Sequence, residues 1–111
     1  MKKLTISLLF LLVLTACQKE QPEPKADPQV TQQFNQADET LDNYLNVLDD
    51  PKTPKDQSTK IICEDYPKTY KADYAPALLK LAPTYTEHGL QKEMNTTLNY
   101  YKQKLGVDCG Q

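Results

Sequence analysis

Apolar side chains recur every three or four residues along most of the chain from residue 30 onward. This spacing collects them on one side of an α-helix, whereas a half-buried strand would carry them at every second position. The first stripe consists of Val30, Phe34, Ala37, Leu41, Tyr44, Leu45 and Leu48. No segment combines sustained alternation with an enrichment in β-branched residues. The sequence therefore predicts an all-α fold.

Polar residues and prolines predict where the first helix begins and ends. Asp27 suits an N-cap, because its carboxylate can accept a hydrogen bond from a free backbone N–H of the first turn. Pro28 suits the first helical position, where the missing N–H costs no hydrogen bond. The sequence Asp-Pro-Lys-Thr-Pro at residues 50–54 ends the helix and predicts a loop.

A second apolar region follows this loop, and prolines interrupt it. Thr53 is predicted to cap a helix that starts at Pro54, and Pro67 can open a further helical turn. Pro76 leaves two alternatives, one kinked helix or two short helices, and Pro83 ends the region. The apolar positions of the region are Ile61, Ile62, Cys63, Tyr66, Tyr70, Tyr74, Ala77, Leu78 and Leu81.

The last predicted helix follows Pro83. Thr84 and Glu87 have the spacing of a capping box, although Gly89 is a poor helix former and leaves a later start open. Gly106 suits the C-cap, with Val107 as the accompanying apolar residue. The apolar stripe of this helix is Leu90, Met94, Leu98, Tyr101 and Leu105.

The N-terminal segment has a different character. Lys2 and Lys3 give it a positive start, and an apolar run extends from residue 4 to residue 14. A transmembrane helix needs about 20 apolar residues, so this run is too short to span a bilayer. It has the length of the apolar region of a signal peptide, and we expect residues 1–16 to be one.

The end of this segment, Leu14-Thr15-Ala16-Cys17, resembles the lipobox of bacterial lipoproteins, in which Leu, a small residue, and Ala or Gly precede an invariant Cys. The resemblance implies that Cys17 receives a diacylglyceryl thioether and becomes the first residue after cleavage. It also implies that the new amine commonly receives a further acyl chain such as palmitate. Several acyl chains make a durable membrane anchor, since each buried methylene contributes about 0.8 kcal/mol. The alternative is an ordinary secretory signal cut elsewhere, with a free or disulfide-bonded Cys17.

The residue after the cysteine bears on the location of the protein. In enteric lipoproteins, Asp at this position favours retention at the inner membrane, and here the residue is Gln18. We therefore expect the outer membrane, with the periplasmic face favoured over the cell surface. Residues 17–28 then form a lipidated, Pro-rich tether, because this segment has no large apolar side chain to bury.

The cysteine count supports this assignment. Three cysteines in an exported chain leave one unpaired, and lipidation of Cys17 leaves Cys63 and Cys109 as a pair. In an oxidising compartment this pair predicts a disulfide, whereas a metal or redox site would need neighbouring ligands. We therefore expect residues 29–111 to form a small three- to four-helix bundle stapled by one disulfide.

Few residues suggest chemistry. His88 is the sole histidine and has no evident nucleophile beside it, so a solvated surface position is favoured. The acidic residues lack the spacing of a calcium loop and are read as a solvated face. The part after Cys17 has 11 Lys, no Arg and 15 Asp and Glu, which argues against nucleic-acid binding. We expect no catalytic residue, no metal and no cofactor.

Tyrosines are the unusual feature of the folded part. A thin core can use tyrosine rings while their hydroxyls reach water, and tyrosine is also enriched at protein interfaces. Tyr100 and Tyr101 must point to different sides of their helix, so at least one is expected to leave the core. The possible interaction surface consists of Tyr70, Tyr74, Tyr100 and Tyr101, with core-edge packing as the favoured alternative.

These features favour a membrane-anchored, non-catalytic protein-interaction module, such as an accessory subunit, adaptor or inhibitor of an unidentified envelope protein. The alternative is a periplasmic carrier or sensor of a small apolar ligand, which needs an internal cavity that a small domain can hardly provide. An enzyme is the least favoured class, because no nucleophile, base and oxyanion donor are evident together.

The lipid anchor can be tested directly. The variant Cys17→Ser removes the sulfur that would carry the diacylglyceryl group, so it is expected to leave the membrane fraction and to lose the mass of the acyl chains. Fractionation and mass spectrometry of the two forms measure both effects. A Cys17→Ser protein that stays in the membrane with unchanged lipid mass would contradict the assignment.

Overall fold

The computed structural model describes residues 27–110 as three helices linked by two short loops. The all-α fold predicted from the sequence is therefore confirmed, with three helices. The predicted signal peptide, the lipidation site Cys17 and almost all of the tether lie outside the described residues. No helix among residues 27–110 has both the length and the hydropathy needed to cross a bilayer.

The first helix, α1 (Pro28–Asp49), begins as predicted. The side chain of Asp27 accepts a hydrogen bond from the backbone N–H of Gln29 at 2.9 Å, and Pro28 occupies the first helical position. The helix ends at Asp50, whose extended backbone still donates its N–H to the carbonyl of Val47 at 3.2 Å. The loop at residues 50–54 then reverses the chain.

The predicted cap of the second helix is wrong in detail. Pro54 occupies the N-cap position, and no side chain caps the helix. Thr53 instead donates its hydroxyl back to the carbonyl of Val47 at 2.7 Å, which satisfies an acceptor at the end of α1. Thr53 thus fastens the loop to the preceding helix.

One long middle helix occupies residues 55–81. Its segments are α2 (Lys55–Lys60), η1 (Ile61–Asp65), α3 (Tyr66–Thr69), η2 (Tyr70–Tyr74) and α4 (Ala75–Leu81), where η1 and η2 are π-helical turns. The residues at the four junctions all have right-handed helical backbone angles, so the helix continues through all five segments. Of the two alternatives for Pro76, the division into two short helices is therefore wrong.

The π-helical turns explain how the helix tolerates two prolines. A proline inside an α-helix removes one N–H donor, and its ring collides with the carbonyl four residues earlier. Each proline here lies two residues after a π-helical turn, Pro67 after η1 and Pro76 after η2. The N–H of the intervening residue bonds to a carbonyl five residues earlier, from Tyr66 to Ile61 and from Ala75 to Tyr70. The wider turn accommodates the carbonyls that lack an N–H donor because of the prolines. The helix therefore continues past each proline without a break.

The third helix, α5 (Glu87–Leu105), starts later than the capping-box prediction implies. Thr86, and not Thr84, is the N-cap, and its hydroxyl accepts a hydrogen bond from the N–H of Gly89 at 3.0 Å. A Cβ at position 89 would lie 3.0 Å from that hydroxyl oxygen, so glycine suits this close approach. The predicted C-cap is confirmed, because Gly106 ends the helix with a positive φ of 65°.

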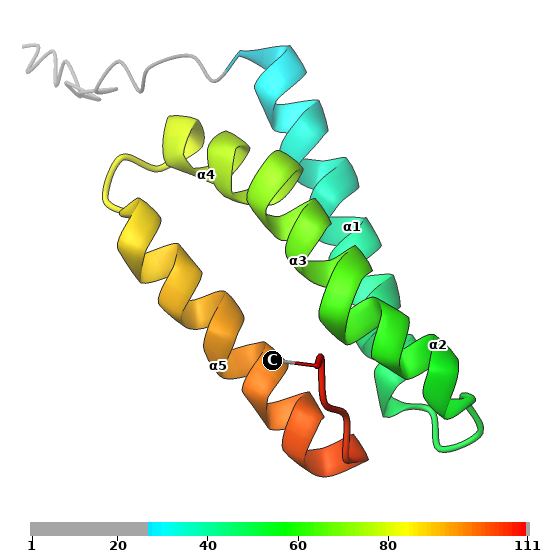
Figure 1. Cartoon of the computed structure of the whole chain (residues 1–111). Coiled ribbons are helices and arrows are strands. Elements are labelled where there is room, and N and C mark those ends of the chain that lie inside the picture. Colours follow the sequence, from blue (N-terminus) through cyan, green and yellow to red (C-terminus); the bar gives the residue numbers. More distant parts are fainter. Residues whose placement is uncertain (1–26, 111) are drawn as a thin grey trace, which may run out of the picture.

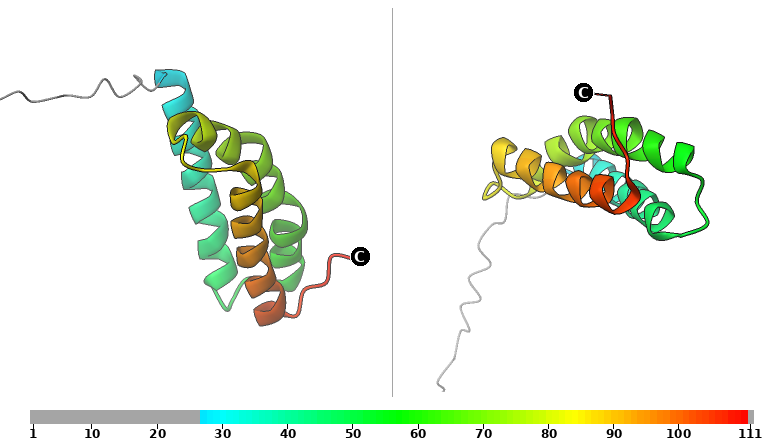
Figure 2. Two further views of the ribbon diagram at one scale, coloured as in Figure 1. Left: turned by 90° about the vertical axis from the view of Figure 1, so that its left-hand side faces the viewer. Right: turned by 60° about the horizontal axis from the view of Figure 1, so that its bottom comes forward.

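Both α1 and α5 pack against the middle helix (Figure 1). The middle helix runs in the opposite direction to the other two, and Figure 2 shows the three helices lying side by side. The shared core draws side chains from all three helices and from the C-terminal segment. Its buried members are Leu41, Leu48, Ile61, Ile62, Tyr66, Tyr70, Leu90, Met94, Leu98, Tyr101 and Val107.

The predicted disulfide is present and joins two distant parts of the chain. Cys63, in η1, bonds to Cys109, 46 residues further on, with their Cα atoms 5.5 Å apart. After Gly106 the chain therefore returns to the middle helix, and Val107 is buried on the way. The C-terminal segment turns back after the end of α5 (Figure 1), and the bond attaches it to the middle helix.

Loss of this disulfide is expected to destabilise the fold. The double variant Cys63→Ala, Cys109→Ala should lower the free energy of unfolding by up to about 4 kcal/mol, because the unfolded chain regains the entropy of a long open loop. Urea unfolding followed by circular dichroism measures the change. Wild-type protein in a reductant should approach the double variant. Equal urea midpoints for oxidised and reduced wild type would contradict the expectation.

Candidate functional site

The four tyrosines of the predicted interaction surface do not share one surface. Tyr70 and Tyr101 are buried in the core, and Tyr74 is half-buried. Tyr100 alone of the four is strongly exposed, at 57%. For Tyr70 and Tyr101 the favoured alternative, packing in the core, is therefore confirmed, and the possible interaction surface does not include them. The expectation that Tyr100 and Tyr101 point to different sides is confirmed.

An aromatic row runs along the middle helix and reaches α1. The ring centroids of Tyr66 and Tyr70 are 6.1 Å apart, and those of Tyr70 and Tyr74 are 4.9 Å apart. Phe34 of α1 continues the row at 5.2 Å from Tyr74. Contacts at these distances add to the stability that ring burial provides, and they fix the position of α1 on the middle helix.

The hydroxyls of this row lie in surroundings that disfavour ionisation. Burial, with Tyr74 and Glu93 as the next contributors, raises the pKa of Tyr66 to about 12. Burial also raises the pKa of Tyr70 and that of Tyr74, with nearby carboxylates adding to both. These phenols therefore stay protonated at neutral pH. They can donate hydrogen bonds but cannot act as bases there.

Tyr70 has a further property. Its hydroxyl oxygen is buried and has no hydrogen-bond partner among the described residues. A buried polar group without a partner costs about 1–3 kcal/mol relative to a paired one. The rest of the row must compensate for this cost through ring packing.

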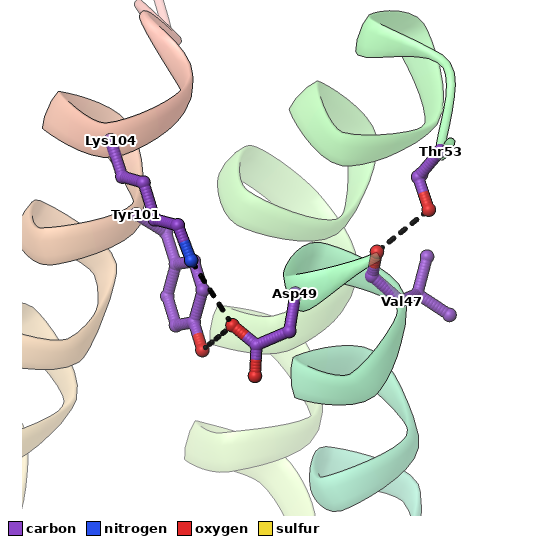
Figure 3. A network of polar contacts seen from close by, with 5 residues as sticks. All are labelled: Val47, Asp49, Thr53, Tyr101 and Lys104. Atoms are coloured by element: carbon purple, nitrogen blue, oxygen red, sulfur yellow. Dashed lines mark hydrogen bonds and ion pairs between the residues drawn. The ribbon is translucent and has the colours of Figure 1, made fainter. Parts of the chain in front are cut away.

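A polar network, drawn in Figure 3, joins α1 to α5 near the residues where both helices finish. The hydroxyl of Tyr101 donates to Asp49 Oδ1 at 2.8 Å, and Lys104 Nζ lies 3.6 Å from the same oxygen. Asp49 is the last residue of α1, whose final turn has no basic residue. A carboxylate at the negative end of a helix is unfavourable by itself, so the contacts from α5 compensate for its position.

Tyr100 stands beside this network. Its ring meets the ring of Tyr101 edge-on, with centroids 4.9 Å apart and an angle of 82° between the planes. Lys104 Nζ lies 5.7 Å from the centroid of each of these rings, within the range of a cation–π contact. We call Asp49, Tyr100, Tyr101 and Lys104 the C-terminal patch. In this patch the exposed ring of Tyr100 rests on Tyr101 and Lys104, and the contacts between α5 and Asp49 of α1 hold these two residues in place.

The described residues form several surface hollows. One, of about 420 Å³, lies along α5 and is lined by the polar side chains of His88, Gln91, Lys92, Asn95, Thr96 and Asn99. Another, of about 240 Å³, lies between the middle helix and α5 and is lined by Tyr70, Lys71, Ala75, Glu87, Gln91 and Met94. His88 is exposed, as predicted. No three His, Cys, Asp or Glu side chains converge within residues 27–110 in a way that could hold a metal ion.

Comparison with known proteins finds no matching family model, no similar curated protein and no matching solved structure. The candidate site is therefore defined by the geometry alone, and the C-terminal patch is its best-defined part.

The raised tyrosine pKa values predict a loss of stability at alkaline pH. Tyr66 and Tyr101 each have a pKa of about 12 in the folded protein, against 10.0 as the ordinary value. For Tyr101 burial is the main cause, followed by the hydrogen bond to Asp49. The unfolded state therefore loses these protons first, so the contribution to stability is complete below pH 10 and is lost as the pH rises through 12.

Urea unfolding at a series of pH values between about 8 and 12 measures this loss. Tyr101→Phe removes one of the groups with a raised pKa. The free energy of unfolding of this variant should therefore fall less steeply with pH than that of the wild type. A urea midpoint that does not change over the whole series would contradict the prediction.

Proposed function

We propose that this protein is a lipid-anchored lipoprotein of the bacterial envelope whose helical domain binds another envelope protein through the C-terminal patch. In this proposal the domain is non-catalytic and acts as an accessory subunit, adaptor or inhibitor. The lipobox resemblance at Cys17 supports the anchor, and Gln18 favours the outer membrane.

The position of the patch supports this role. The predicted tether precedes α1, and Asp49 of the C-terminal patch is the last residue of that helix. A helix of 22 residues is about 33 Å long at about 1.5 Å per residue. The preceding tether adds a reach of up to roughly 30 Å, since Pro-rich segments extend by about 3.1 Å per residue. A partner in the periplasm could therefore meet the patch well away from the bilayer.

The single observation that carries the proposal is the exposure of Tyr100. A ring that is 57% exposed adds little to the stability of the fold, yet its orientation is fixed by Tyr101 and Lys104. Tyrosine is enriched among the residues that dominate binding energies, because it buries a large area and has few rotamers to immobilise. Tyr100 is therefore suited to act as an anchor residue for a protein partner.

The alternative, a carrier of a small apolar ligand, receives less support. Such a carrier needs an enclosed apolar cavity, and side chains from all three helices fill the interior. The hollows described above lie at the surface, and polar side chains line the one along α5 throughout. We therefore retain the interaction module as the proposal.

The proposal predicts one dominant partner that depends on the anchor and on Tyr100. In-cell crosslinking, pull-down and mass spectrometry are to be compared for the wild type, Cys17→Ser and Tyr100→Ala. Loss of an anchor residue should lower partner recovery by roughly tenfold, since such residues contribute more than 1 kcal/mol each. Cys17→Ser should lose the partner because the two proteins no longer share a membrane surface.

Asn99→Ala is the matched control, because Asn99 is the exposed neighbour of Tyr100 on α5 and belongs to no part of the patch. Its recovery of the partner should equal that of the wild type. Equal recovery by Tyr100→Ala and the wild type would contradict the role of the patch. Absence of any partner above background in all forms would contradict the interaction module itself.

A further inference from the structure

The hollow between the middle helix and the first half of α5 has a mixed lining. Its volume is about 240 Å³, and each of the two helices contributes three of the residues that line it. These residues are Tyr70, Lys71, Ala75, Glu87, Gln91 and Met94. The hollow is therefore a site formed between two helices, and we call it the interhelical hollow.

The interhelical hollow combines an apolar inner wall with a polar rim. Met94 is 3% exposed and Tyr70 is 5% exposed, so these two side chains belong to the inner wall. Lys71, Glu87 and Gln91 are exposed and belong to the rim. A ligand with an apolar part and charged groups can therefore bury the former while the latter remain near water.

The rim carries one charge of each sign, and the two charges do not pair with each other. Within residues 27–110 the one ion pair joins Lys104 to Asp49, so Lys71 Nζ lies more than 4.0 Å from the carboxylate of Glu87. Glu87 occupies the first turn of α5, where the helix dipole favours a negative charge. A ligand that carries both a carboxylate and an ammonium group would complement the two charges.

Tyr70 supplies a hydrogen-bond donor that lacks a partner. Its hydroxyl oxygen is buried, and no group of residues 27–110 pairs with it. Burial raises the pKa of this phenol, and Glu93 adds to the effect, so the hydroxyl keeps its proton at neutral pH. Buried polar groups in native proteins nearly always have a partner. A carboxylate that reached the inner wall of the hollow would supply the acceptor.

We propose that the interhelical hollow binds a free α-amino acid with an apolar side chain, such as leucine. Tyr70 and Lys71 donate to its carboxylate, Glu87 accepts from its ammonium group, and its side chain packs on Met94 and Ala75. The volume lies below the range of about 300–1,000 Å³ that is typical of sites for drug-sized ligands, so a single amino acid suits the hollow.

This site is separate from the C-terminal patch, with which it shares no residue. Tyr100 follows Gln91 by nine residues, or about two and a half helical turns, so the two side chains lie on opposite sides of α5. A protein partner held at Tyr100 would therefore leave the hollow accessible. The inference goes beyond the proposed function, and its test needs no protein partner.

The test is an NMR titration of the backbone amides of the full chain carrying Cys17→Ser, with L-leucine as the probe. The expected shifts concentrate at Lys71, Ala75 and Gln91. They should saturate with a Kd of about 1 mM, because exposed charge contacts are weak. Lys71→Gln and Glu87→Gln should each weaken binding about threefold, since each variant loses one charge contact.

Tyr70→Phe tests the hydroxyl separately from the ring. It should weaken leucine binding about tenfold, because a hydrogen bond to a charged group is lost. Without leucine its urea midpoint should equal or exceed that of the parent, because the variant no longer buries an unpaired hydroxyl. Unchanged leucine affinity in folded Tyr70→Phe would contradict the inference. Lys71 and Glu87 are exposed, so their variants decide the outcome if Tyr70→Phe does not fold.

Matched ligands and a matched variant make the result specific. The ligand 4-methylpentanoate lacks the ammonium group of leucine, 3-methylbutylamine lacks the carboxylate, and glycine lacks the apolar side chain. Each should bind at least about threefold more weakly than leucine. The variant Glu64→Gln, Lys68→Gln removes one charge of each sign from exposed positions of the middle helix outside the hollow, and it should bind leucine like the parent.

Three outcomes would overturn the inference. The first is an absence of leucine-dependent shifts at the residues of the hollow. The second is binding of any of the three analogues as tightly as leucine. The third is weakening by Glu64→Gln, Lys68→Gln as large as that by Lys71→Gln or Glu87→Gln.

Discussion

The whole bundle depends on the continuity of the middle helix, residues 55–81. Both α1 and α5 pack against it, and the aromatic row, Cys63 and the loop before α5 all take their positions from it. A break at Pro67 or Pro76 would turn these attachment points away from one another. The two π-helical turns prevent this, because they widen the helix where each proline leaves a carbonyl without its usual donor.

The middle helix also aligns the tyrosines. Side chains four positions apart lie on the same side of a helix, about one turn from each other. Tyr66, Tyr70 and Tyr74 therefore form a row, with ring centroids 4.9 to 6.1 Å apart. This gives a domain without tryptophan a continuous aromatic support. The cost is the unpaired hydroxyl of Tyr70, since a ring placed this deep cannot bring its polar end to water.

Local signals in the sequence predicted local structure well. Asp27, Pro28 and Gly106 act within one helical turn, and each takes its predicted position. The predictions for Thr53 and Thr84 were wrong, because a neighbouring residue could cap or begin the helix equally well. The site was harder to predict: the periodicity placed Tyr70 and Tyr101 on apolar stripes, but only packing between helices shows that they are buried and that Tyr100 and Tyr85 are exposed. The link from Asp49 to Tyr101 spans 52 residues, and no local pattern indicates it.

The end of α1 shows how two helices share one electrostatic cost. Asp49 faces the unfavourable end of its own helix, and α5 supplies Lys104 and Tyr101 to compensate. The exposed carboxylates Asp38 and Glu93 form no ion pair within residues 27–110, and water can solvate them. The compensation at Asp49 also holds Tyr101 and Lys104 against the ring of Tyr100, so the contacts that stabilise the end of α1 are the same ones that orient the exposed ring.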